Sequence, residues 1–344
     1  MNRTPFVALA GLSLLLSGCS AKKAEVSLYC ALDQEHSEAL VAVFQQETGI
    51  PVHANYDTES NKTVGLVSQL VEEAAHPRCD VFWNNELAQT VRLGQKGLLQ
   101  PYFAPSAASI PEEFKDAAGL WTGFAARARI IIVNTKVLGT DRAAWPKSLT
   151  DFADPKWKGK CAIAKPLTGT TLTHFAALRE VMGKEKFGAW LDGLEKNDVK
   201  WLQSNGATMK ATADNIDGVA FALTDTDDFH VALSKGQPVA AVFPDQQEGG
   251  FGTMLIPNSI ALVKGAPHAD LGRKFIDFVL GERVEGLLAA AKSAQIPVRA
   301  GVKGPAAEQI LSIGKFRQMT WDPTRVAASL DEASREFADR FQSR

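Results

Sequence analysis

The chain has 344 residues, of which 37 are lysine or arginine and 39 are aspartate or glutamate, so its formal net charge is −2. This balance, with no basic run or stripe, excludes nucleic acid as an expected partner. Hydrophobic residues make up 45% of the chain, the ordinary share for a globular protein with a full core.

The N-terminus has the pattern of an export signal. Arg3 precedes an apolar run over residues 5–16, which is too short to span a bilayer and is typical of a signal peptide. The following Leu-Ser-Gly-Cys resembles the lipobox of bacterial lipoproteins, which implies cleavage before Cys19 and acylation of its thiol. The alternative is an ordinary signal peptide with an incidental cysteine. Removing the predicted signal peptide, residues 1–18, leaves 344 − 18 = 326 residues, enough for two domains.

Three further cysteines, Cys30, Cys79 and Cys161, lie in or beside apolar runs that resemble strands. Their number is odd, and none forms a pair with metal-ligand spacing, so the sequence predicts neither a zinc site nor a disulfide framework. We expect buried single thiols. A bridge between Cys30 and Cys79 is the alternative in an oxidising compartment.

Strands and helices alternate in the first part of the mature chain. Apolar patterns and helix-stop signals predict strands over 25–30, 50–55 and 79–85, and helices over 34–48 and 64–75. This β-α-β-α-β order predicts a parallel, doubly wound sheet. Ligands bind at the carboxyl ends of strands in such a sheet, and four polar residues fall there: Asp33, Asn84, Asn85 and Glu86. For Asp33, capping of the following helix is the alternative, and it is compatible with ligand contact.

The chain then enters a second domain. After a proline-rich passage over 101–111, a strand is expected over 128–134, and we place the first crossover near Arg127. Further strands are expected over 159–164 and 198–202, and helices over 172–182, 187–195 and 207–215. This alternation is again that of an α/β domain.

A short motif rich in threonine opens the helix over 172–182. Its members are Thr168, Gly169, Thr170 and Thr171. Gly169 allows close backbone approach, and the threonine hydroxyls add donors to the free amides of a helix start, which suits an anion. Routine helix capping by threonine is the alternative.

Three carboxylates lie close together after a buried strand. The apolar run over 218–223 predicts this strand, and a short helix ending at Gly236 follows. Between them stand Thr224, Asp225, Thr226, Asp227 and Asp228. Helix capping explains one aspartate, but three repel one another unless something cationic lies among them. We therefore predict that these three aspartates face a cation, either a hard metal ion or an ammonium group.

The remaining chain returns to the first domain. Strands are expected over 238–244 and 253–263, followed by a helix over 269–280 and helical segments over 304–344. The six histidines show no HExxH or other paired spacing, and no G-x-S-x-G elbow occurs in the mature chain. No catalytic residue is therefore predicted, and an exported metal-assisted hydrolase using the three aspartates is the enzyme alternative.

Several motifs together resemble the periplasmic solute-binding proteins of ferric-iron ABC importers and their phosphonate- and sugar-phosphate-binding relatives. They are Glu-Thr-Gly-Ile-Pro-Val at 47–52, Asp-Val-Phe-Trp at 80–83, Gly-Leu-Leu-Gln-Pro-Tyr at 97–102, Trp-Thr-Gly at 121–123, Arg-Ala-Arg at 127–129, the segment 166–171 and Pro-Asn at 257–258. The resemblance implies a type II periplasmic-binding-protein fold, in which two doubly wound α/β lobes with a hinge close on a ligand. Lobe 1 is expected to comprise 19–126 and about 253–300, and lobe 2 to comprise 127–252 and about 301–344.

At the positions of the family's ferric-iron ligands, this chain departs from the family's pattern. The place of its two consecutive tyrosines falls on Asp227 and Asp228, and the chain contains no tyrosine pair. A histidine ligand of some members falls at Asp33, and a glutamate ligand falls near Asn85 or Glu86. The resemblance therefore leaves Asp33, Asp227 and Asp228 as candidate metal ligands. The anion-binding features of the family are better kept, at Arg127, Thr168 to Thr171 and Asn205.

The expected function is that of a lipid-anchored extracytoplasmic solute-binding protein of an ABC importer. Its ligand is expected to have cationic and anionic parts: ferric or another hard metal ion with a partner anion, or an aminoalkylphosphonate-like zwitterion. A sugar phosphate is the alternative ligand. We expect no cofactor, since a bound metal ion would be the transported ligand, and the partners are the solute and a membrane permease. The protein is expected to be a monomer, in the periplasm or on the outer face of a bacterial membrane.

Overall fold

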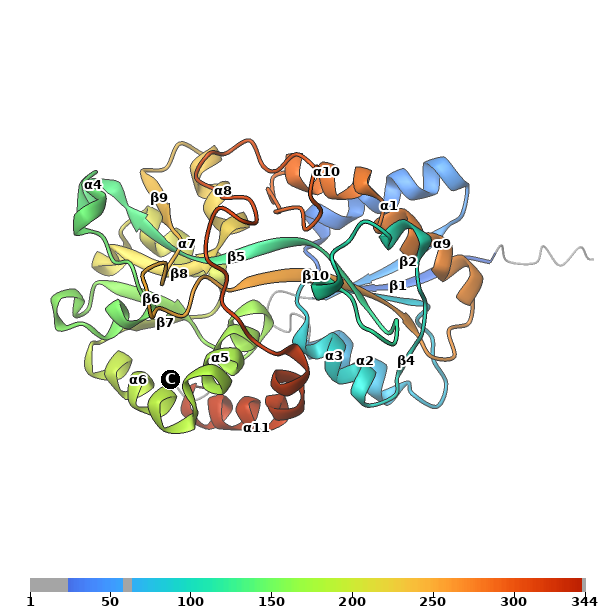
Figure 1. Ribbon diagram of the computed structural model, residues 1–344, viewed down its shortest axis with the longest axis horizontal. Coiled ribbons are helices and arrows are strands. Elements are labelled where there is room, and N and C mark those ends of the chain that lie inside the picture. Colours follow the sequence, from blue (N-terminus) through green and yellow to red (C-terminus); the bar gives the residue numbers. More distant parts are fainter. Residues whose placement is uncertain (1–23, 58–63, 342–344) are drawn as a thin grey trace, which may run out of the picture.

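Two α/β lobes joined by long strands make up the molecule (Figure 1). This computed structural model describes residues 24–57 and 64–341, so the predicted signal peptide and Cys19 lie outside the described residues. Strands β5 (Thr122–Asn134) and β10 (Leu255–Val263) pair antiparallel and run between the lobes. Every residue of both strands is buried, which fits strands covered on both faces. Arg127, the predicted crossover point, lies within β5.

The first lobe carries the parallel sheet that the sequence predicts. Its elements are β1 (Val26–Cys30), α1 (Gln34–Thr48), β2 (Val52–Tyr56), α2 (Val64–Glu72), β3 (Val81–Asn84), α3 (Ala88–Gln95), β4 (Leu99–Gln100) and α9 (Ala269–Val279). Strand β1 pairs in parallel with β2 and β3, and β10 joins β3 in the antiparallel sense. The predicted β-α-β-α-β order is confirmed. Helix α1 ends as expected at Gly49, whose φ of 64° is the left-handed conformation that glycine favours at a helix end.

The second lobe combines parallel and antiparallel strands. Its elements are β6 (Cys161–Ala164), α5 (Gly169–Met182), α6 (Lys184–Lys196), β7 (Lys200–Leu202), α7 (Asn205–Ala213), β8 (Phe221–Asp225), α8 (Thr226–Ser234) and β9 (Val239–Val242). Strand β6 pairs in parallel with β7 and β8, whereas β5 pairs antiparallel with β8 and β9. The carboxyl ends of β6, β7 and β8 therefore meet at one edge of the sheet, where α5, α7 and α8 begin.

Several segments of the chain form short 3₁₀ turns or irregular structure, and one of them lies where helix was expected. Short 3₁₀ turns at 105–107, 112–114, 142–144, 149–153, 155–157 and 216–218, with α4 (Thr135–Leu138), occupy the proline-rich and turn-rich passages. Within 301–341 the only helix described is α11 (Pro323–Phe341), so the expectation of several helical segments there was wrong. Helix α11 packs against α3 and α5 and so contacts both lobes. Among the described residues, no helix combines the length and apolar character that a membrane crossing needs.

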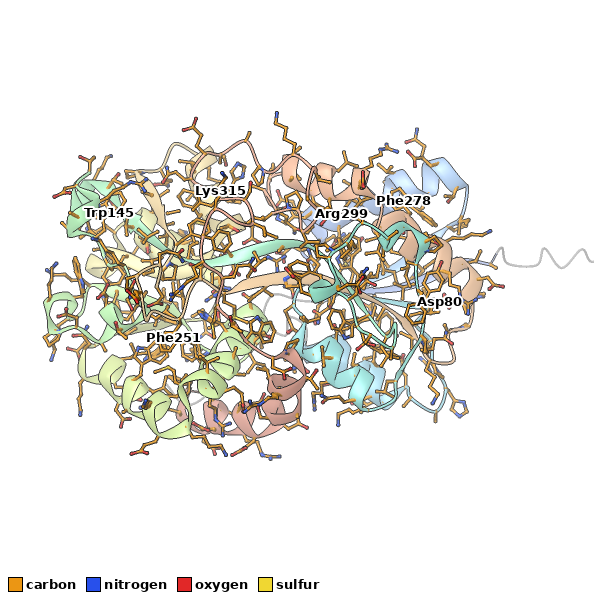
Figure 2. The ribbon with its side chains drawn as sticks, viewed as in Figure 1. Asp80, Trp145, Phe251, Phe278, Arg299 and Lys315 are labelled. Atoms are coloured by element: carbon orange, nitrogen blue, oxygen red, sulfur yellow. The ribbon has the colours of Figure 1, made fainter. Side chains whose placement is uncertain are left out.

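The chain between α10 (Glu282–Ala290) and α11 is fixed by a buried ion pair. Arg299 is labelled in Figure 2. Its Nη1 lies 2.9 Å from Glu285 Oε2, and both side chains are fully buried. Glu285 Oε1 also accepts hydrogen bonds from the backbone amides of Ala125, in β5, and of Val298. These contacts hold the segment after α10 against the strands that join the lobes. The predicted lobe boundaries stay a prediction.

The three cysteines of the described residues are buried and free, so the alternative of a bridge between Cys30 and Cys79 is not seen. Burial raises the pKa of the Cys30 and Cys161 thiols to about 12, and that of Cys79 well above its usual range. We expect none of the three to react with an aromatic disulfide reagent at about pH 8, because the thiolate is the reactive form. In denaturant all three should react.

A variant that begins after Cys19 is the sample for this measurement, since only these three thiols remain. Prompt reaction of one thiol in the native protein would contradict its buried position. The denatured sample is the control that all three groups are chemically intact.

Candidate functional site

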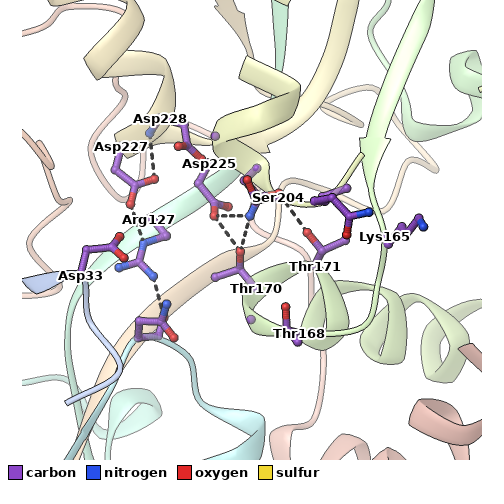
Figure 3. Close-up of a pocket in the computed structure, with 16 residues that line it drawn as sticks. Asp33, Arg127, Lys165, Thr168, Thr170, Thr171, Ser204, Asp225, Asp227 and Asp228 are labelled. Carbon is purple, nitrogen blue, oxygen red and sulfur yellow. Dashed lines mark hydrogen bonds and ion pairs between the residues drawn. The ribbon is translucent and has the colours of Figure 1, made fainter. Parts of the chain in front are cut away.

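One polar pocket collects residues from both lobes and from β5 (Figure 3). It encloses about 650 Å³, its open mouth included. The lining comprises Asp33, Asn85, Arg127, Ala164, Lys165, Thr168, Gly169, Thr170, Thr171, Gln203, Ser204, Asn205, Gly206, Asp225, Asp227 and Asp228. Every predicted binding residue except Glu86 is among them. Lys165 and Gln203 were not predicted from the sequence. Lys165 directly follows β6 and Gln203 directly follows β7. Their positions at the carboxyl ends of strands could have indicated them.

Asp225 is the last residue of β8, and its side chain does not cap the helix that follows. It stands at the N-cap of α8, yet its side chain makes no capping hydrogen bond. Its Oδ1 lies 2.7 Å from Arg129 Nη1, and its Oδ2 accepts from Thr170 Oγ1 at 2.7 Å and from Asn205 Nδ2 at 3.0 Å. Both carboxylate oxygens are therefore used to join β5, α5 and α7 around the pocket.

Arg129, beside the pocket lining, was also missed by the sequence reasoning. It is fully buried and faces Asp225 directly in the register between β5 and β8. Its Nη1 and Nη2 also lie 3.3 Å from Thr170 Oγ1 and Thr171 Oγ1, and its Nε lies 3.4 Å from His174 Nδ1. Burial, with the Arg129 charge second, lowers the pKa of His174 well below its usual range, so this imidazole is neutral at pH 7. The signal for Arg129 was its spacing of two from Arg127, since residues i and i+2 of a strand share one face.

Asp227 and Asp228 lie in the first turn of α8, where carboxylates are favoured by the helix dipole. Asp227 Oδ2 is 3.2 Å from Arg127 Nε, and its Oδ1 accepts from the Asp228 amide at 3.0 Å. Asp228 Oδ2 accepts from Thr224 Oγ1 at 3.0 Å. The helix starts at Thr226, earlier than predicted, so both carboxylates belong to the helix rather than to a loop before it.

Arg127 connects the two lobes through its guanidinium. Its Nη1 donates to the backbone oxygen of Asn85 at 2.6 Å, and its Nη2 lies 3.4 Å from Asn258 Oδ1 in β10. The Nε faces Asp227, as described above. The sequence predicted an anionic solute group as the partner of Arg127, but in the structure all three nitrogens face oxygens of the protein.

The N-termini of two helices, α5 and α7, form a second wall of the pocket. Thr168 is the N-cap of α5 and makes no side-chain capping bond, and Gly169 has a φ of 57° with open space where a Cβ would point. Ser204 caps α7 by accepting from the Ala207 amide at 3.1 Å. Thr171 Oγ1 donates to Asn205 Oδ1 at 2.9 Å, which ties the two helix starts together. Helix N-termini attract negatively charged groups, so this wall suits an anion.

Glu86 is the one predicted binding residue that lies outside the pocket. Its carboxylate is fully buried and accepts from Thr173 Oγ1 at 2.6 Å, from Asn84 Nδ2 at 2.8 Å and from the Gln89 amide at 3.0 Å. Burial, opposed by these hydrogen bonds, raises its pKa. Glu86 therefore connects the start of α3 to α5, and the prediction of its ligand contact is corrected.

The charges of the lining do not balance. It contains four carboxylates against Arg127 and Lys165, so its formal charge is 2 − 4 = −2, or −1 when the adjacent Arg129 is counted. Oxygens of Asp225, Asp227 and Asp228 lie within 4.8 Å of one another, close enough to hold a metal ion. The predicted metal set differs, because it names Asp33 in place of Asp225. The cation expected among the three aspartates is present in part as the two arginines.

Known proteins match this chain over most of its length. A family described as bacterial extracellular solute-binding proteins matches residues 81–325. Iron uptake protein A1 of Synechocystis is 27% identical, covering 96% of this chain and 94% of its own. A putative 2-aminoethylphosphonate-binding periplasmic protein of Salmonella typhi is also 27% identical, covering 77% of each chain.

Solved structures show the same fold. Iron-bound HitA from Pseudomonas aeruginosa superposes with a TM-score of 0.79 at 26% identity, covering 91% of this chain and 99% of its own. AfuA from Actinobacillus pleuropneumoniae, with fructose-6-phosphate bound, gives a TM-score of 0.78 at 20% identity, covering 93% and 99%. The predicted type II periplasmic-binding-protein fold is confirmed, and these relatives are transport proteins rather than enzymes. The chain belongs to the bacterial extracellular solute-binding proteins.

Proposed function

We propose that this binding protein captures a small zwitterion of the aminoalkylphosphonate type and delivers it to a membrane permease. The observation that carries the proposal is the separation of charge in one pocket. Figure 3 shows Asp33, Asp227 and Asp228 on one side, with Arg127 among them, and Lys165 on the other, with the α5 threonines between them. A solute with an ammonium group and an anionic group matches both sides at once.

The excess of carboxylates in the lining supports a cationic group on the solute. A pocket with a formal charge of −2, or −1 with Arg129, disfavours a ligand that is only anionic, such as a sugar phosphate. An ammonium group supplies three hydrogen-bond donors that carboxylates accept. Hydrogen bonds of this charge-assisted kind are roughly twice as strong as neutral ones.

The anionic half is matched by the wall that α5 and α7 form. The N-termini of these helices, Lys165 and the hydroxyl groups of the Thr168 to Thr171 motif all lie there. Helix starts of this kind bind phosphate and sulfate groups through the dipole and the backbone amides. A phosphonate group therefore fits this wall better than the carboxylate side.

A hard metal ion with a partner anion is the second candidate, because three carboxylates lie within 4.8 Å of one another and relatives include iron-binding proteins. Two features favour the zwitterion. The phenolate pair of the ferric proteins is missing, and both oxygens of Asp225 already accept from Arg129, Thr170 and Asn205. Asp225 therefore has no carboxylate oxygen to offer a metal ion without giving up one of these contacts.

A thermal-shift screen of the wild-type protein tests the ligand class, since a bound solute raises the melting temperature by mass action. The panel contains 2-aminoethylphosphonate, fructose 6-phosphate, and ferric ion with and without phosphate. We expect stabilisation by the aminophosphonate in the presence of a chelator. Stabilisation by ferric ion alone, removed by the chelator, would contradict the proposal and favour the metal candidate.

We also propose that Cys19 is the mature N-terminus and carries the lipid that holds the protein at the membrane. The Leu-Ser-Gly-Cys sequence and the apolar run before it support this proposal. In the Cys19→Ser variant we expect the protein either to leave the membrane fraction or to stay unprocessed. A variant that stays membrane-bound and is trimmed at the same site would contradict lipidation. Cys161→Ser, a buried cysteine far from the signal, is the matched control.

A further inference from the structure

A buried hydrogen bond joins the two lobes beside the pocket. Thr173 Oγ1, in α5 of the second lobe, donates to Glu86 Oε2, just before α3 of the first lobe, over 2.6 Å. Figure 1 shows α3 and α5 in different lobes. Both side chains are almost completely buried, so water competes poorly for either group. The contact is therefore a direct link between the lobes that does not pass through the solute.

Glu86 is a fixed acceptor on the first lobe. Its Oε1 accepts from Asn84 Nδ2 at 2.8 Å and from the Gln89 amide at 3.0 Å, and its backbone oxygen accepts from Ser259 Oγ at 2.8 Å. These partners come from β3, α3 and β10. Each partner of the carboxylate donates, so the group is held as an acceptor, with Oε2 facing Thr173. Of these contacts, the bond from Thr173 is the one that reaches the second lobe.

The two partners of this bond are next to residues that line the pocket. Thr173 follows Thr170 by three positions and Thr171 by two in α5, and both of those threonines belong to the lining. On the other lobe, Asn85 directly precedes Glu86 and also belongs to the lining. Neither Glu86 nor Thr173 is a lining residue. The bond thus connects two walls of the pocket from outside it.

We infer that Glu86 and Thr173 are positioning residues whose hydrogen bond holds the two lobes at the spacing that binds solute. The inference rests on the proposed function only in that a solute binds between the lobes, whatever its charges. A solute between two walls must contact both at once. When the binding-competent spacing is only partly populated, the apparent dissociation constant rises in proportion. Loss of the bond lowers that population and so weakens binding.

Thr173→Val tests the inference, because valine has nearly the shape of threonine but lacks the hydroxyl group. We expect this variant to bind 2-aminoethylphosphonate about tenfold more weakly than the wild type in calorimetry, with an unchanged stoichiometry. Thr173→Ser keeps a hydroxyl donor and should restore most of the affinity. Small-angle scattering without solute should give a larger radius of gyration for Thr173→Val than for the wild type or Thr173→Ser.

Thr212→Val is the matched control. Thr212 is as buried as Thr173 and lies in α7, which also begins at the pocket, but its hydroxyl donates at 3.0 Å to the backbone oxygen of Thr208 in the same helix. This variant should match the wild type in affinity and in radius. A loss in Thr212→Val as large as that in Thr173→Val would overturn the inference, because the link between the lobes would then not be the cause. If Thr173→Val does not fold, Thr173→Ala replaces it with the same expectations.

Failure of this inference and failure of the proposed function give different results. If the wild type binds the probe, affinity decides: equal affinity in Thr173→Val overturns the inference and leaves the proposed function standing. If the wild type does not bind 2-aminoethylphosphonate, the proposed function fails and the scattering comparison decides. A larger radius confined to the variant without the hydroxyl group then supports the inference, and equal radii in all the proteins overturn it.

Discussion

Asp228→Asn is expected to weaken the binding of 2-aminoethylphosphonate by about 10- to 100-fold. A hydrogen bond to a charged group contributes about 1.5–3 kcal/mol, and about 1.4 kcal/mol corresponds to a factor of ten in affinity. The substitution removes the negative charge and keeps an oxygen that can accept from Thr224 Oγ1, as Asp228 Oδ2 does at 3.0 Å. The fold should therefore be preserved, and calorimetric titration of the two proteins measures the loss.

For this test, Asp228 is a better position to substitute than Asp227. Asp227→Asn would leave the buried Arg127 guanidinium without its counter-charge, and a loss of binding would then be confused with a loss of stability. The matched control is Asp270→Asn, which also changes an aspartate in the first turn of a helix, α9, but at an exposed site outside the pocket. Unchanged affinity in Asp228→Asn would remove this carboxylate from the binding site.

Arg129→Met is expected to lower the free energy of unfolding by about 3–5 kcal/mol, because breaking a buried ion pair leaves an uncompensated charge. The charge left behind is that of Asp225, which is 2.7 Å from Arg129 Nη1 and only 4% exposed. Urea denaturation of the wild type and the variant measures the difference. Binding should weaken as well, because Arg129 positions Thr170 and Thr171 at the start of α5.

Two further variants serve as references for the expected effect of Arg129→Met. Arg273→Met breaks an exposed pair with Asp270, and exposed pairs are worth about 0–1 kcal/mol. The double variant Arg129→Met, Asp225→Asn should be less destabilised than the sum of its single changes, since the buried charge is gone. An Arg129→Met protein as stable as Arg273→Met would contradict the role assigned to this pair.

The sequence predicted the fold well where signals are local. Helix α1 matches its predicted limits because Asp33 and Gly49 mark its two ends and the apolar positions between them repeat with the helical period. Strand β5 is longer than predicted, since it begins at Thr122. Antiparallel pairing of Thr122, Gly123 and Phe124 with β10 extends the strand at its start.

The site was predicted less completely because its partners are distant in sequence. Arg129 binds Thr170 and Asp225, which are 41 and 96 positions away, and no local pattern encodes such a contact. Glu86 was placed correctly at the end of a strand, but its side chain turns inward to Thr173 of the other lobe. Three neighbouring aspartates repel one another unless a cation lies among them. The protein itself supplies two arginines there, Arg127 and Arg129, which no local sequence pattern indicated.

The central claim is that one solute must carry both charges, and calorimetry with three matched probes tests it most directly. Wild-type protein is titrated with 2-aminoethylphosphonate, with ethylphosphonate, which lacks the ammonium group, and with ethylamine, which lacks the phosphonate, all in the presence of a chelator. The account predicts binding of one equivalent of the first probe, with an affinity at least about tenfold above that of either half. Equal binding of ethylphosphonate, or heat released only by a metal ion once the chelator is omitted, would contradict it.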